Sequence, residues 1–154
     1  MNVVLKILAA TALSILGFVA AAMAEEQTVV VEDAWSRASI GVNRPGAAYM
    51  MVRNIGEDTV ILTGLRTDLA KMPEIHLTST NDQGVSSMTP AGDIEIAPGE
   101  AAALEPGGLH AMLMRLSRPM VEGETFALTL IFADDNDITV DVPILGIAAR
   151  GPES

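Results

Sequence analysis

The chain has 154 residues, with 20 acidic and 9 basic side chains and a formal net charge of −11. This acidity disfavours nucleic acid and anionic membranes as partners, because both attract basic surfaces. There is no cysteine. Disulfides and thiolate metal ligands are therefore excluded, and the fold has to be stabilised by its core alone.

The first 24 residues have the pattern of a secretory signal peptide. Lys6 precedes an apolar run from Ile7 to about Ala22, and Ala22-Met23-Ala24 supplies the small residues of a cleavage site. We expect cleavage after Ala24 and a periplasmic location, without attachment as a lipoprotein, since no cysteine follows the run. The alternative is an uncleaved membrane anchor, because the run approaches the roughly 20 residues that span a bilayer.

Removal of this leader leaves a length that suits one domain with a core of its own. We expect that domain to cover residues 25–148 and residues 149–154 to form a flexible tail, because they are small, polar and contain proline. No internal repeat or low-complexity linker suggests a second domain.

Short runs rich in apolar and β-branched residues recur along the chain, separated by Gly, Pro, Asn and Asp. The candidate strands are 29–35, 47–53, 59–65, 74–79, 85–89, 93–97, 101–104, 110–116, 126–132 and 138–144. Residues 67–71 are the one candidate helix. A spacing of about ten residues predicts a single all-β domain, a sandwich or barrel of about eight or nine strands.

Both histidines of the chain lie close in sequence to a methionine. His110 and Met112 alternate along one candidate strand, so they project from the same face with Cα atoms about 6.5–7 Å apart. His76 and Met88 lie on either side of a turn at residues 81–84. Thioether is the ligand that distinguishes Cu(I) from zinc, calcium or magnesium, so this combination favours copper.

The turn decides whether His76 and Met88 share a face. With a plain four-residue loop and Thr80 paired to Val85, the two side chains would point to opposite sides. One extra residue in a bulge, for which Gly84 is the natural position, shifts the pairing by one and brings them together. We therefore predict an irregularity in this hairpin.

The remaining methionines have a simpler interpretation. A lone methionine on a strand is usually a filler of the core. We expect this role for Met50, Met51, Met72, Met114 and Met120. A lone histidine is likewise more often structural than a ligand, and only the joint pattern of two His–Met pairs favours a metal site.

The motif resembles that of the periplasmic copper chaperone family PCu(A)C, formerly a domain of unknown function. That family has a His, an optional Met, ten residues, a Met, twenty-one residues and then His-x-Met. These spacings are reproduced by His76, Met88, His110 and Met112, with Leu77 at the position of the optional methionine. The resemblance extends over about residues 29–142 and includes the segments 33–37, 47–49 and 106–113.

The resemblance implies a cupredoxin-like Greek-key β-sandwich that binds one copper ion, with Cu(I) preferred and Cu(II) as an alternative. The implied ligands are His76, Met88, His110 and Met112. It also implies transient partners, either an oxidase copper subunit or a Sco-type chaperone, and delivery of copper for assembly of the cytochrome c oxidase copper site. We expect a monomeric carrier that is not an enzyme and binds neither nucleic acid nor, after cleavage, the membrane.

Three other functions compete with a copper carrier. A blue-copper electron-transfer protein needs a cysteine thiolate, so the composition excludes it. A copper enzyme would have to work with only two imidazoles. A plain interaction domain of the cell envelope would bury the four residues apart from one another, and the structure tests this alternative directly.

Overall fold

The computed structural model describes residues 26–152, and the expected leader lies outside them. The described residues form ten strands and no helix, and none of them belongs to a helix that is long and apolar enough to cross a membrane. The candidate helix at residues 67–71 is therefore wrong. Thr67 donates a hydrogen bond to the carbonyl of Ala127 and accepts one from the Leu69 amide, so its side chain stabilises a bend instead.

All ten candidate segments form strands, which is slightly more than the eight or nine expected. They are β1 (Val29–Arg37), β2 (Gly46–Asn54), β3 (Val60–Arg66), β4 (Ala70–Thr80), β5 (Ser86–Pro90), β6 (Ile94–Ile96), β7 (Ala101–Leu104), β8 (Leu109–Leu116), β9 (Thr125–Phe132) and β10 (Ile138–Leu145). The largest difference is in β4, which begins four residues before the predicted start.

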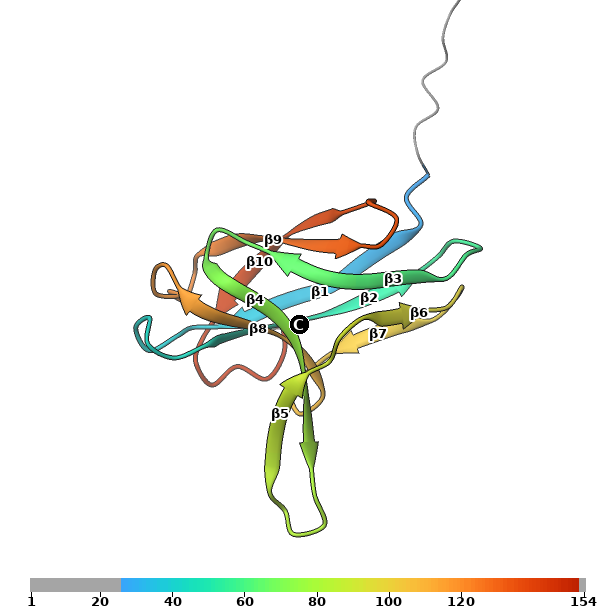
Figure 1. The fold of residues 1–154 in the computed structure, drawn as a ribbon. Helices are drawn as coiled ribbons and strands as arrows, with labels where there is room; N and C mark the ends of the chain where they lie inside the picture. The colour runs from blue at the N-terminus through green and yellow to red at the C-terminus, as the bar shows by residue number, and fades with distance from the viewer. Residues whose placement is uncertain (1–25, 153–154) are drawn as a thin grey trace, which may run out of the picture.

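The strands form two layers packed face to face (Figure 1). One layer has the order β5-β4-β8-β7-β2-β1 and the other has the order β10-β9-β3-β6, with β1 and β10 joined as parallel neighbours. β3 also contacts β4, and β6 contacts β7, so the two layers close toward a barrel. The predicted all-β, cupredoxin-like sandwich is confirmed.

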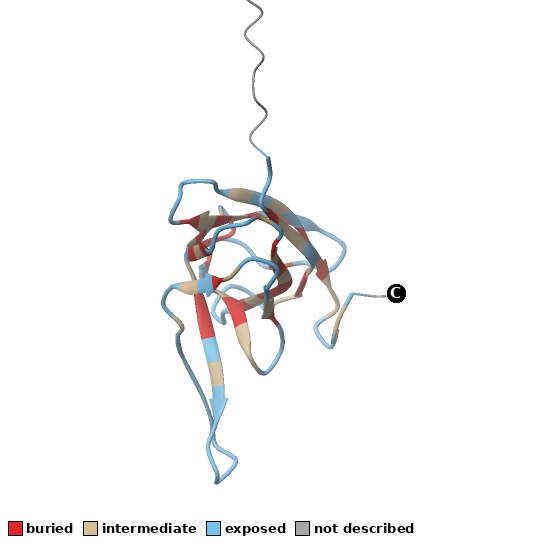
Figure 2. Cartoon of the chain, turned by 90° about the vertical axis from the view of Figure 1, so that its right-hand side faces the viewer, coloured by how far each residue is buried: buried red, intermediate tan, exposed pale blue. Residues whose placement is uncertain are grey.

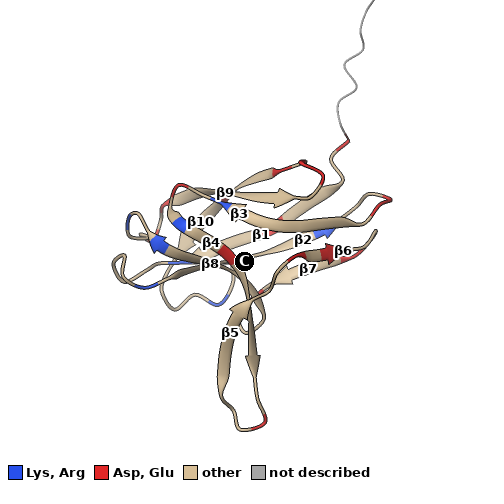
Figure 3. Ribbon diagram, in the orientation of Figure 1, with Lys and Arg blue, Asp and Glu red and all other residues tan. Residues whose placement is uncertain are grey.

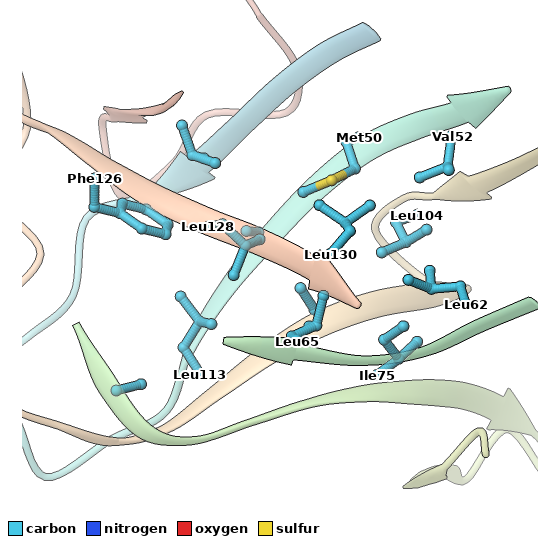
Figure 4. Close-up of a cluster of buried hydrophobic side chains, with 14 of the residues drawn as sticks. Met50, Val52, Leu62, Leu65, Ile75, Leu104, Leu113, Phe126, Leu128 and Leu130 are labelled. Atoms are coloured by element: carbon cyan, nitrogen blue, oxygen red, sulfur yellow. The ribbon is translucent and has the colours of Figure 1, made fainter. Parts of the chain in front are cut away.

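The core lies between the layers and consists mainly of alternate residues from every strand except β5 (Figure 4). In β9, Phe126, Leu128 and Leu130 point inward, whereas the residues between them are exposed or half-buried. Met50 and Met120 belong to this core, as expected. The core fixes which face of each strand is turned outward, and this decides where the histidines and the other methionines can lie.

β4 and β5 extend beyond the sandwich as a hairpin (Figure 1). All five residues of β5 are exposed, and Figure 2 shows the exposed hairpin continuing from the buried part of β4. β5 is the last strand of its layer, so one of its edges has no other strand of the described residues beside it.

The difference in burial between core and hairpin predicts how much two matched substitutions lower the free energy of unfolding. Leu128→Ala should lower the free energy of unfolding by about 2–5 kcal/mol, because it leaves a cavity between the layers. Leu77 on β4 is 41% exposed, so Leu77→Ala should lower it by less than about 1 kcal/mol. Urea unfolding of both variants measures the difference, and equal losses would contradict this assignment of the core.

Candidate metal centre

The pairing of β4 with β8 brings the two histidines together. His76 lies directly opposite His110, with ring centroids 6.3 Å apart and ring planes at 53°. The adjacent pair, Ile75 and Ala111, points into the core and is buried. Because side chains alternate along a strand, both histidines point to the opposite face of the sheet. We call this face, turned away from the core, the outer face.

The two methionines of the motif share the outer face. Met112 follows His110 by two residues on β8, so both side chains project from the same side. Met88 on β5 lies opposite Thr78, which shares the face of His76 on β4. All four residues therefore point to one face from three neighbouring strands, which contradicts the alternative in which they are scattered.

The β4–β5 hairpin has the shifted register that this arrangement needs. Thr78 pairs with Met88, which is the pairing expected when the loop contains one extra residue. Gly84 has a φ of +78°, and its amide donates a 2.9 Å hydrogen bond to the Asn81 carbonyl. A left-handed glycine after such a turn is the usual way to add one residue to a hairpin loop. The predicted irregularity, and its position at Gly84, are confirmed.

The His110 ring is oriented by the backbone. Its Nδ1 lies 3.1 Å from the carbonyl oxygen of Gly108. A carbonyl oxygen only accepts hydrogen bonds, so Nδ1 carries the proton of the neutral ring and Nε2 keeps a free lone pair. His110 is only 5% exposed, so its ring is held against the protein and not in open solvent.

The His76 ring is oriented the other way round. Its Nε2 lies 3.1 Å from Oε2 of Glu74, and a carboxylate accepts, so Nε2 carries the proton and Nδ1 the lone pair. That Nδ1 is buried and has no hydrogen-bond partner among the described residues, and His76 is 8% exposed. A buried polar atom left unpaired costs about 1–3 kcal/mol. A metal ion bound to Nδ1 would remove this cost.

The distance between the rings suits one shared ion. With metal–nitrogen bonds of about 2 Å, an ion bound by both rings lies roughly 3 Å from each centroid, so the centroids can be at most about 6 Å apart. The observed 6.3 Å is close to this limit, so the rings have to approach each other only slightly to share one ion. Within residues 26–152, no three His, Cys, Asp or Glu side chains are grouped to hold a metal.

A hollow of about 540 Å³ opens on the same face. Met88, His110 and Met112 line it together with Tyr49, Arg37 and Arg44. Asp82 is the only charged residue in 75–90, and Figure 3 shows the β4–β5 hairpin almost free of charge. The side of the hollow that β5 provides is therefore nearly neutral, whereas two arginines supply positive charge on the other side.

The sequence did not predict the aromatic cluster beside this hollow. Trp35 and Tyr49 are cross-strand partners, with ring centroids 4.6 Å apart. The Arg37 guanidinium lies 5.6 and 5.5 Å from these two centroids, and its Nε donates a 2.6 Å hydrogen bond to the Ala149 carbonyl. The sequence feature that could have indicated this cluster is that its residues fall in segments 33–37 and 47–49, which resemble recurrent segments of a known family.

The expected core role is wrong for three methionines. Met51, Met72 and Met114 neither belong to the core cluster nor pack against it. The physical reason is alternation: Met50 and Leu113 point inward, so Met51 and Met114 have to point outward. Met72 points outward as well, because it is the cross-strand partner of Met114.

Comparison with known proteins identifies relatives of the whole sandwich. The family described as "Putative lipoprotein LpqE-like" matches residues 29–144. "Putative lipoprotein Lxx21020" of Leifsonia xyli subsp. xyli (strain CTCB07) is 32% identical over 117 residues, which cover 75% of this chain and 69% of that protein.

Solved structures agree with this relationship. Cu(I)-bound DR1885 of Deinococcus radiodurans is 31% identical, with a TM-score of 0.62 over 80% of this chain and 83% of that one. The copper-bound PCuAC domain from PmoF2 has a TM-score of 0.64 at 21% identity, over 78% of this chain and 94% of that one. The fold is therefore of the PCuAC type.

The ring orientations predict opposite tautomers for the two histidines. In alkaline buffer, where imidazole is neutral, long-range ¹H–¹⁵N correlation spectra should show the proton on Nε2 of His76 and on Nδ1 of His110. The substitution Glu74→Leu should remove the preference at His76 and leave His110 unchanged. The same tautomer at both positions would contradict the hydrogen bonds described above.

Proposed function

Because the chain belongs to the LpqE-like family and has a PCuAC-type fold, we propose that it is a copper carrier. It binds one Cu(I) through His76, Met88, His110 and Met112, on the outer face of β4, β5 and β8. The observation that carries this proposal is the buried Nδ1 of His76, which has no hydrogen-bond partner within residues 26–152, on the face that the other three residues share. DR1885 and the PmoF2 domain, named for their copper-bound forms, support copper as the cargo.

The ligand chemistry favours Cu(I). Two imidazoles and two thioethers are all neutral, so the bound ion keeps a single positive charge. Harder cations prefer oxygen ligands, which these four side chains do not supply. Glu74 accepts a hydrogen bond from the His76 ring, which fixes the tautomer and leaves Nδ1 as the ligating nitrogen. Cu(II) is an alternative cargo that imidazole also accepts.

The arrangement suits delivery better than catalysis. Met88 is 55% exposed and lies on the edge strand β5, so it is the ligand that an incoming donor can replace with least disturbance. Exchange of Met88 for a ligand from the acceptor then opens the centre while the two histidines still hold the ion. The proposed acceptor is an oxidase copper subunit, or a Sco-type chaperone that serves it, in assembly of cytochrome c oxidase.

We propose a periplasmic location, with the leader cleaved after Ala24. The family and the Leifsonia relative are named as lipoproteins, which supports export. Bacterial lipoproteins carry their lipid on a cysteine, and the 154 residues contain none, so release into the periplasm is the form of export proposed. N-terminal sequencing of the exported protein, with membrane and soluble fractions assayed separately, tests this location.

Competition for Cu(I) with a chromogenic chelator tests the centre. The wild-type protein should bind one equivalent tightly, and His76→Ala and His110→Ala should each weaken that equivalent by at least 100-fold, an order-of-magnitude expectation for losing one of few ligands. Met51→Leu is the matched control, because Met51 is a half-buried methionine on the outer face away from the centre, and it should bind as wild type does. Equal binding by wild type and His110→Ala would refute the centre.

Delivery predicts a separate result. Cu(I)-loaded protein mixed anaerobically with the apo copper domain of an oxidase subunit, or with a Sco-type chaperone, should lose its copper to that partner. Met88→Leu should change the transfer rate more than the equilibrium position, because Met88 is the ligand proposed to exchange first. Copper retained after long incubation with both partners would exclude the proposed acceptors and leave the binding result unaffected.

A further inference from the structure

The outer face carries more thioethers than the four-ligand centre uses. Met72 on β4 lies directly opposite Met114 on β8. This pair is the next same-face pair after Glu74 and Met112, and Glu74–Met112 in turn follows the pair of histidines. Sulfur and imidazole donors therefore continue along one face from the exposed hairpin to the far end of β8.

Packing does not explain the methionine pair. Met72 is 36% exposed and Met114 is half-buried, and neither contributes to the core or packs against it. Methionine has a long, flexible side chain and a polarisable sulfur, and thioether sulfur is a ligand that selects Cu(I). Two such side chains beside a copper centre can bind Cu(I) through sulfur, which other exposed apolar side chains could not do.

Met112 connects the pair to the four-ligand centre. Met112 and Met114 are two residues apart on one face, with Cα atoms about 6.5–7 Å apart. Met72 has its Cβ about 4.5–5.5 Å from that of Met114, and the diagonal to Met112 is about 7–8 Å. Three long side chains at these spacings can bring their sulfur atoms to one point above the sheet.

We propose that Met72, Met112 and Met114 form a second, weaker Cu(I) site made of three thioethers. The proposal rests on the copper-carrier function and adds a place where the ion enters or leaves. Because Met112 belongs to both sites, the ion can move by ligand exchange. Its bond to Met112 is kept, the bonds to the histidines and Met88 break, and bonds to Met72 and Met114 form. The oxidation state and the charge do not change.

Glu74 lies between the two sites and favours this movement. It is the cross-strand partner of Met112, and its side chain is 44% exposed while one oxygen accepts from His76. A carboxylate beside the path of a cation lowers the energy of the ion when it is held only by neutral sulfurs. The row of donor side chains thus offers Cu(I) a continuous path across the outer face.

The test compares the double variant Met72→Leu/Met114→Leu with the control Met51→Leu. Leucine conserves volume, so both variants should fold, and circular dichroism verifies this. Met51 shares the outer face, but its cross-strand neighbours Glu32 and Ala103 are not thioethers. Each protein is titrated anaerobically with Cu(I) against chelators of two strengths, and X-ray absorption counts sulfur neighbours at one and two equivalents.

Wild type and Met51→Leu should bind a second equivalent more weakly than the first, held by the sulfur atoms of Met72 and Met114 while Met112 serves the four-ligand centre. The double variant should lose that equivalent and keep the first unchanged. A second equivalent retained by the double variant, or absent from wild type, would overturn the proposal. Failure of the four-ligand centre gives a different result, since His110→Ala would then leave the tighter equivalent unchanged while the Met72/Met114 comparison still decides the second site.

Discussion

The pairing register between β4 and β8 is the constraint on which the outer face depends. Ile75 and Ala111 are opposite each other and buried, so the histidines beside them face outward together. A slip of either strand by one residue would turn the imidazole of that strand into the apolar core, away from the other imidazole, and would expose the core side chains of that strand. The packing that stabilises the sandwich therefore also fixes which donors can meet on its outer face.

Orientation of the two rings adds a second level of order. Glu74 and the Gly108 carbonyl each accept the ring proton, and they do so at different ring nitrogens. The lone pairs on Nδ1 of His76 and Nε2 of His110 are consequently set before any ion arrives. A site whose ligands are already oriented spends less free energy on ordering when it binds. The methionines are less constrained, and Met88 least of all because β5 is exposed throughout.

The sequence was sufficient for the strands and for the motif, because both depend on local spacing. Alternation and turn residues located all ten strands, and the extra residue needed to bring His76 and Met88 onto one face located the irregularity at Gly84. The direction of Met51, Met72 and Met114 was missed, since it depends on which neighbours the core buries. The Trp35–Tyr49 contact was also missed, because it follows an irregularity in the β1–β2 register near Asp33, which no residue spacing indicated.

The exposed hairpin has one further consequence. Beyond its backbone pairing with β4, its outer part is stabilised by hydroxyl contacts such as Thr80 with Ser86, and its backbone hydrogen bonds face solvent, as is typical of segments that open without global unfolding. An ion held by Met88 and by the buried histidines would fasten this hairpin to the sandwich. Binding of the ion and ordering of the hairpin are then linked. A docking partner can therefore recognise the loaded protein by its ordered hairpin as well as by the metal itself.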